Sequence, residues 1–187
     1  GFLVKVWCPF PLKKTLTINH LKYLTSIGVP KLLEPPNPKG KELWIDAVLG
    51  NNQKRKIDDD LIKLFNKKFN NRFGKILSID VPTGLCPDSG KPFFKNAVKA
   101  HYTLVIGLNK IGLIQDSALA FIGKLIHIDI GITRNHLSKI EEKIFKITYE
   151  DLKKIQLPSF PKNTNKYKSG RTLLITGSEK YPGAAYL

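Results

Sequence analysis

The sequence has no methionine, two cysteines and four histidines among its 187 residues. The two cysteines, Cys8 and Cys86, are too few for a disulfide framework and leave no second pair for a zinc site. The four histidines show no metal-ligand spacing. No apolar run approaches the roughly 18 residues that a membrane span needs. These absences exclude disulfide-rich secreted, zinc-finger and membrane-spanning classes and favour a cytoplasmic protein.

The composition is otherwise that of a globular protein, with 42% hydrophobic and 10% aromatic residues. A net charge of +16 raises the question of nucleic-acid binding, because clustered Lys and Arg neutralise phosphates. The lysines are scattered along the chain and do not alternate with aromatic residues as in RNA-recognition modules. Nucleic-acid binding is therefore not favoured.

The two ends of the sequence resemble interiors of longer chains. Gly1 leads directly into a strand-like run, and residues 172–178 begin a further strand and turn near the other end. We therefore expect an internal fragment of a larger protein.

The hydrophobic pattern alternates between strand-like and helix-like periods, which predicts an α/β fold with a mostly parallel sheet. A buried strand is expected at residues 2–7, followed by a helix that Thr17 caps and Gly28 ends, and an irregular connection at residues 30–40. The remaining expected strands are residues 43–49, 75–80, 102–106, 124–132 and 145–148, and the remaining expected helices are residues 58–69, 116–122 and 149–155. Residues 158–169 are linker-like, so we predict domains at residues 1–157 and 158–187.

Residues 76–85 carry the strongest functional signal. An aliphatic run ends at Asp80, and Pro82, Thr83 and Gly84 then stop the strand. Because ligands of open parallel sheets bind at the carboxyl ends of the strands, Asp80 is well placed for chemistry. The alternative is an Asx-type turn in which the carboxylate bonds only to local amides. The neighbouring hydroxyl and unshielded backbone favour an oxygen-rich site for a hard cation or a ligand hydroxyl.

A second carboxylate, Asp46, lies within the apolar run 43–49, where an unpaired charge would cost several kcal/mol. A bound cation or a hydrogen-bonded turn would each satisfy it, and both alternatives stay open. The following loop combines a glycine, amides and basic side chains, which suits a pyrophosphate, although a solvated basic loop is the simpler interpretation. Its residues are Gly50, Asn51, Asn52, Gln53, Lys54, Arg55 and Lys56. Lys110 either faces the same crevice or is solvated.

Several motifs in register resemble the YjeF N-terminal domain family, the NAD(P)H-hydrate epimerases. They are residues 46–50, 79–85, 88–90, 97–100, 110–113 and 128–132. The resemblance covers residues 1 to about 133. Residues 168–185 are similar to the opening of the ADP-dependent NAD(P)H-hydrate dehydratase domain, and bacterial members often fuse the two domains.

The resemblance implies a Rossmann-like three-layer epimerase domain followed by the start of a ribokinase-like domain. It implies a metabolite-repair enzyme that interconverts the R and S forms of hydrated NADH and NADPH (NADHX and NADPHX). Asp46 and Thr83 would bind potassium, residues 50–56 would bind the dinucleotide, and Asp80 would contact the substrate as the catalytic acid and base. Most members have serine in place of Thr83, and threonine keeps the oxygen.

The resemblance has further consequences beyond these residues. The family's glycine-rich Asn-Asn-Gly-Gly-Asp segment would lie upstream of Gly1, so we expect the fragment to be inactive by itself. ADP or ATP would serve only the dehydratase domain of the full-length protein, and a homo-oligomer is left open.

Two alternatives compete with this interpretation. One is a non-catalytic nucleotide- or RNA-binding scaffold of the same fold, which would explain the positive charge. The other is an ordinary Rossmann oxidoreductase, which needs a glycine fingerprint that this sequence does not contain. The presence of Asp46, Asp80 and Thr83 together favours the enzyme.

Overall fold

The computed structural model describes residues 1–51, 53, 57–139, 147–156, 163, 165, 171, 173–180 and 183. These residues belong to two compact units, Gly1–Lys139 and Ile140–Leu187. The domain boundary expected between residues 157 and 158 stays a prediction.

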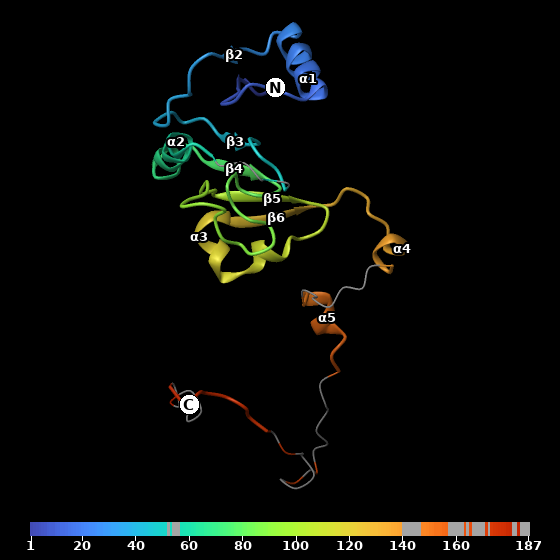
Figure 1. Cartoon of the computed structure of the whole chain (residues 1–187). Coiled ribbons are helices and arrows are strands. Elements are labelled where there is room, and N and C mark those ends of the chain that lie inside the picture. The colour runs from blue at the N-terminus through green and yellow to red at the C-terminus, as the bar shows by residue number, and fades with distance from the viewer. Residues whose placement is uncertain are drawn as a thin grey trace. The chain divides into compact units, whose positions relative to one another are not determined.

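A four-stranded parallel sheet forms the centre of the first unit (Figure 1). Its strands follow one another in chain order as β3 (Trp44–Asp46), β4 (Ile76–Ile79), β5 (Tyr102–Ile106) and β6 (Lys124–Ile128). A separate parallel pair joins β1 (Val6–Trp7) to β2 (Lys31–Leu32). Parallel neighbours require crossover connections, and most of these contain a helix. The α/β class with parallel sheets is thereby confirmed.

The first crossover helix of the central sheet is α2 (Asp59–Phe69), and its ends follow the chemistry of its sequence. The Asp58 carboxylate accepts the backbone N–H of Asp60 at 3.0 Å, so it caps the helix as expected. Acidic residues occupy the first turn and lysines the last, which complements the helix dipole.

The crossover between β5 and β6 is built from short helical turns. It comprises the 3₁₀ helices η1 (Ile111–Ile114) and η2 (Asp116–Ala118), followed by α3 (Leu119–Ile122).

In the part of the chain that the structure describes, no helix is long and apolar enough to cross a membrane.

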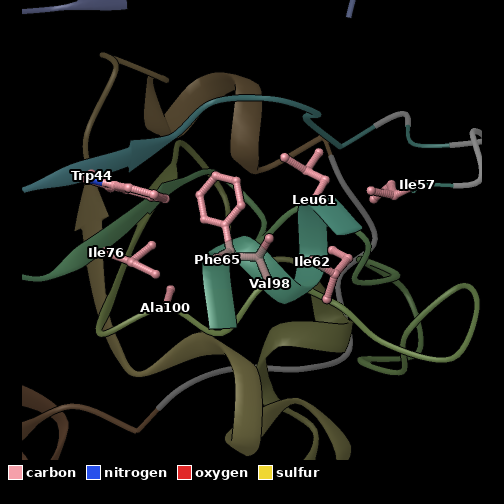
Figure 2. Packing of buried hydrophobic residues seen from close by; sticks show 8 residues of the cluster. All are labelled: Trp44, Ile57, Leu61, Ile62, Phe65, Ile76, Val98 and Ala100. Carbon is pink, nitrogen blue, oxygen red and sulfur yellow. The ribbon is translucent and has the colours of Figure 1, made fainter. Parts of the chain in front are cut away.

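One face of the central sheet is covered by these crossover elements. Strand residues alternate between faces, and the register places Trp44, Ile76, Thr103 and Val105 on the same face. Trp44 and Ile76 pack against α2, as Figure 2 shows, where the Phe65 ring meets Trp44 edge to face at a centroid distance of 5.6 Å. Val105 packs with buried residues of η1, η2 and α3 in a second cluster. Two adjoining cores therefore hold this face.

The opposite face of the sheet is apolar and partly exposed among the described residues. Ile45, Tyr102, Ile106 and Ile128 on this face are between 36% and 57% exposed, whereas their neighbours on the covered face are largely buried. The described residues thus supply the sheet layer and one helical layer of the expected three.

The N-terminal segment differs from the sequence-based prediction. The strand expected at residues 2–7 contains only Val6 and Trp7, and Phe2 and Leu3 are fully exposed. Its parallel partner β2 lies where an irregular connection was expected. Helix α1 (Thr15–Ser26) begins two residues before the predicted cap Thr17, has no side-chain cap and buries no residue. The exit at Gly28 is confirmed, with a φ of 85°.

The other elements match in position with shorter bounds. Strands β3, β4 and β6 are each shorter than predicted, and their last paired residues are Asp46, Ile79 and Ile128. The strand at residues 102–106 and a helical segment within residues 116–122 are confirmed. A short helix, α4 (Arg134–Leu137), follows β6 and was not predicted.

In the second unit, α5 (Tyr149–Lys153) confirms the helix expected there. Thr148 and Asp151 form a capping box, with the Asp151 backbone N–H bonded to the Thr148 hydroxyl at 3.4 Å. The strand expected at residues 145–148 lies partly outside the described residues. The strand expected near residue 172 is wrong for the described residues 173–177, which are exposed and form no strand.

We expect Phe65→Ala to lower the free energy of unfolding by about 3–5 kcal/mol, because it leaves a cavity beneath β3 and removes the contact with Trp44. Phe94→Ala is the matched control, since half of that side chain is exposed, and it should cost about 1 kcal/mol or less. Chemical denaturation of the two variants provides the measurement. Equal losses would contradict the assignment of the core.

Candidate functional site

The two predicted carboxylates lie at the carboxyl ends of neighbouring strands. Asp46 is the last residue of β3, and Asp80 directly follows the last residue of β4. Asp46 is paired in register with Ser78, two residues before Asp80. The structure therefore brings both carboxylates to one edge of the sheet, where ligands of parallel α/β proteins bind.

The Asp46 carboxylate is completely buried and is held by hydrogen bonds from β4 and the turn that follows it. Its Oδ1 accepts the Thr83 hydroxyl at 2.6 Å and the Val48 N–H at 3.4 Å. Its Oδ2 accepts the Ser78 hydroxyl at 2.8 Å and the Thr83 N–H at 2.9 Å. Of the two alternatives open from the sequence, a hydrogen-bonded turn is present.

Burial nevertheless dominates the protonation of this group. Removal from water raises the pKa of the Asp46 carboxyl above its usual value, and the hydrogen bonds from Thr83, Ser78 and Val48 only partly offset this. No cationic side chain forms an ion pair with Asp46 among the described residues. The ionised carboxylate therefore lacks a positive partner.

The chemistry of these groups suits a hard cation. A carboxylate and a hydroxyl within hydrogen-bond distance are both oxygen donors, and the buried negative charge would be neutralised by an ion. The Thr83 hydroxyl also accepts the Leu49 N–H at 3.1 Å, so an ion would compete with existing bonds. Within the described residues no group of three or more His, Cys, Asp or Glu side chains could hold a metal. The donor set thus fits an alkali ion better than a transition metal.

The turn at residues 80–85 is rigidly anchored. Val98 N–H donates to Thr83 O at 2.8 Å, and Phe93 N–H donates to Gly84 O at 2.9 Å. Gly84 has a φ of 93°, and a Cβ there would lie 3.2 Å from Ala97 and from the Ile57 side chain. Only glycine fits this conformation and this close approach without strain.

The predicted dinucleotide loop is joined to this turn by Gln53. Gly84 N–H donates to Gln53 Oε1 at 2.5 Å, and Gln53 Nε2 donates to Pro82 O at 3.2 Å. Gln53 is 4% exposed, whereas Gly50 and Asn51 are exposed. Asn52, Lys54, Arg55 and Lys56 lie outside the described residues. The Gln53 side chain is thus bonded to the turn, and its expected contact with the dinucleotide stays a prediction.

Asp80 has an unusual backbone conformation, with a φ of 68°. Left-handed backbone at a residue other than glycine costs about 1–3 kcal/mol and clusters at functional sites. Its carboxylate bonds to the Lys110 ammonium and accepts the Ile106 N–H at 3.3 Å. These partners belong to β5 and the loop after it, so a local Asx turn does not explain Asp80.

Sequence reasoning missed or underrated two residues of this edge. Ser78 was overlooked, although a serine on the buried side of an aliphatic strand, two positions before Asp80, was a signal for a polar partner. Lys110 was more easily taken as solvated, yet its side chain is only 17% exposed.

A pocket of about 390 Å³ lies elsewhere, between Trp7, Phe10 and one side of α2, and none of the predicted site residues lines it.

Comparison with curated proteins identifies relatives along most of the chain. The chain is 39% identical over 151 residues to a bifunctional NAD(P)H-hydrate repair enzyme Nnr of Dictyoglomus turgidum, covering 80% of the chain and 29% of that protein. It is 31% identical to the protein of the same name from Gloeobacter violaceus, with 100% of the chain and 38% of that protein covered. An NAD(P)H-hydrate epimerase of Oenococcus oeni is 31% identical, with 60% of the chain and 53% of that protein covered. The chain thus spans about a third of the bifunctional relatives.

The fold comparison agrees with these relatives. The crystal structure of the yeast protein YNL200c superposes with a TM-score of 0.58 at 21% identity, covering 80% of this chain and 64% of that one. This likeness supports the Rossmann-like α/β fold alone. The family model described as YjeF-related protein N-terminus matches residues 1–112, more than half of the chain. Together with the carboxylate edge at β3 and β4, this match establishes that the chain belongs to the YjeF-related protein N-terminus family.

Proposed function

We propose that this chain carries the epimerase part of an NAD(P)H-hydrate repair enzyme. Its substrates would be the R and S forms of NADHX and NADPHX, and the full-length protein would dehydrate the S form in a second domain with ADP or ATP. Membership of the family and the names of the relatives support this proposal.

The observation that carries the proposal is the placement of Asp80. Its carboxylate is held at the carboxyl edge of the sheet by a left-handed backbone and by Lys110, and 18% of the side chain stays accessible. To invert the hydrated ring carbon, either its bond to the hydroxyl oxygen or the ring itself must open and close again. Both routes need proton transfer at the hydroxyl oxygen. A positioned carboxylate supplies such a transfer.

The loop at residues 50–56 is proposed to bind the pyrophosphate of the dinucleotide. The buried anchor at Gln53 supports this role, since it holds the loop against the turn after Asp80. One short basic loop at a strand end matches a dinucleotide better than an extended polyanion. A nucleotide- or RNA-binding scaffold is therefore the second candidate, and the strained Asp80 paired with Lys110 argues for the enzyme over it.

Potassium is proposed to bind at Asp46 and Thr83. When bound, the ion would supply positive charge to a carboxylate that has no cationic partner among the described residues, and it would orient oxygen atoms at the edge of the site. Asp46 and Thr83 themselves hold the turn at residues 80–85 in place, which keeps Asp80 in position. A cytoplasmic location is also proposed. Two free cysteines, Cys8 and Cys86, are compatible with a reducing compartment.

The potassium proposal predicts an ion-dependent stability. Because burial raises the pKa of Asp46, the folded chain holds this proton more tightly than the unfolded chain. The contribution of Asp46 to stability is therefore present at low pH and is lost as the pH rises above 3.8 through the folded pKa. Potassium should oppose this loss and add about 2.7 kcal/mol at one hundred times its Kd.

The measurement is the free energy of unfolding of the full-length protein against pH, in potassium chloride and in tetramethylammonium chloride of equal ionic strength. Asp46→Asn is the control, because the amide carries no charge, and it should remove both the pH dependence and the ion dependence that belong to this group. Identical stability of the unaltered protein in both salts would refute the ion site.

The catalytic assignment predicts that Asp80→Asn in the full-length protein lowers epimerase turnover on the order of 100-fold or more. Asparagine tolerates left-handed backbone and keeps the shape, but it cannot take up a proton. The melting temperature should change little. Asp59→Asn, an exposed substitution in the first turn of α2, is the control and should retain full turnover. Chromatography of the R and S forms provides the measurement, and an active Asp80→Asn variant would end the assignment.

A further inference from the structure

Asp80 is fixed by contacts on both sides of its strained backbone. Its N–H donates to Leu104 O of β5 at 2.7 Å, and the next N–H, of Val81, donates to Ile79 O at 2.8 Å. A left-handed conformation persists only where the surroundings overdetermine it. These bonds therefore fix the direction in which the carboxylate leaves the main chain.

Lys110 connects the ends of β4 and β5 through this carboxylate. Its ammonium bonds to Asp80 Oδ1 and donates to Ile106 O at 2.9 Å, while Ile106 N–H donates to the same Oδ1 at 3.3 Å. The Lys110 and Asp80 side chains are only 17% and 18% exposed. Such a shielded pair is stronger than a surface salt bridge, because solvent screens it less.

The loop that presents Lys110 is itself held in place. Gly107 N–H donates to Ile128 O of β6 at 2.9 Å, and the His127 ring contacts Gly107 O. At the other end of the loop, Leu113 N–H donates to Lys110 O at 3.0 Å as η1 begins. The ammonium is thus positioned by neighbouring strands and a helical turn.

The two oxygens of Asp80 have different environments. Oδ1 has two donors, from Lys110 and Ile106, whereas no described residue donates to Oδ2. Enzymes often use one residue to fix the orientation of another residue that transfers a proton. Such transfer requires the acid-base group to lie within hydrogen-bond distance of the proton, and its pKa matters only once this geometry is met.

We propose that Lys110 is the positioning residue for Asp80, and this inference rests on the proposed epimerase function. Lys110 anchors Oδ1, so that Oδ2 accepts the proton of the ring hydroxyl while the C–O bond becomes a carbonyl and the bond from that carbon to the ring nitrogen breaks, its electron pair passing to the nitrogen. The nitrogen then re-forms this bond on the other face of the carbonyl carbon, and Oδ2 returns the proton to the oxygen. Lys110 keeps its own proton throughout. The cycle consumes no net proton and needs no oxidant or reductant, as an epimerisation requires.

The test compares Lys110→Met and Lys110→Arg in the full-length protein, with NADHX as substrate. Lys110→Met should lower kcat by about 10- to 100-fold, within the range of acid-base contributions, and change KM by less than about threefold. Lys110→Arg keeps a positive charge and N–H donors for Asp80 Oδ1 and the Ile106 carbonyl, so it should retain kcat to within about tenfold of the unaltered protein. Lys91→Met, an exposed lysine in the turn after Gly90, is the matched control and should leave both constants unchanged.

A double variant separates this inference from the proposed function. If Lys110 acts through Asp80, adding Lys110→Met to Asp80→Asn should produce no further loss of kcat. An equal additional loss, or an unchanged kcat with a lowered melting temperature in Lys110→Met, would overturn the positioning role and leave Asp80 catalytic. Full activity of Asp80→Asn would instead overturn the proposed function. If Lys110→Met does not fold, Lys110→Arg with a kcat reduced 100-fold would also contradict the inference.

Discussion

The arrangement of the site depends on a buried carboxyl group at the end of β3. Asp46 has no access to water, and its oxygens are satisfied by donors from Ser78, Thr83 and Val48. Leaving such a group without donors would cost several kcal/mol, so the chain after β4 is constrained to return its amide and hydroxyl to this carboxylate. That constraint determines where the turn lies, and the turn carries Asp80. The hydrogen bonds of Asp46 and the position of the proposed catalytic residue Asp80 therefore follow from one interaction.

The hydrophobic core supports this edge from one side of the sheet. Period-two alternation places Trp44, Ile76 and Val105 on the face that α2 and the η1 to α3 segment cover. Burial of these side chains stabilises the folded state and offsets the cost of local strain. The left-handed backbone of Asp80 costs about 1–3 kcal/mol. The strain is located where bonds from β5 and Lys110 hold it. The energetic cost and the proposed chemistry thus occur at the same residue.

Prediction from the sequence worked where the signal was local. The acidic cap and amphipathic period of α2 and the aromatic, β-branched strand at residues 102–106 each depend on neighbours in sequence, and both were confirmed. The prediction of a strand at residues 2–7 was wrong in its length, because the length of a strand depends on the residues with which it pairs. Only Val6 and Trp7 find pairing residues in β2, so the apolar residues before them stay exposed. Hydrophobicity alone did not distinguish a paired strand from an unpaired one.

The sequence by itself determined the α/β class, the placement of Asp80 at a strand end and the resemblance to the YjeF family, because periodicity and turn residues are properties of adjacent positions. It placed Asp46 within a strand, and the structure showed that this strand ends at Asp46. Only the tertiary structure decided which side chains satisfy those carboxylates. Ser78 and Thr83 bond to Asp46 across 32 and 37 positions, Gln53 bonds to Gly84 across 31, and Lys110 bonds to Asp80 across 30. Such pairs form when parallel strands bring distant segments to one edge, and hydrogen-bond geometry there selects partners that no local pattern specifies.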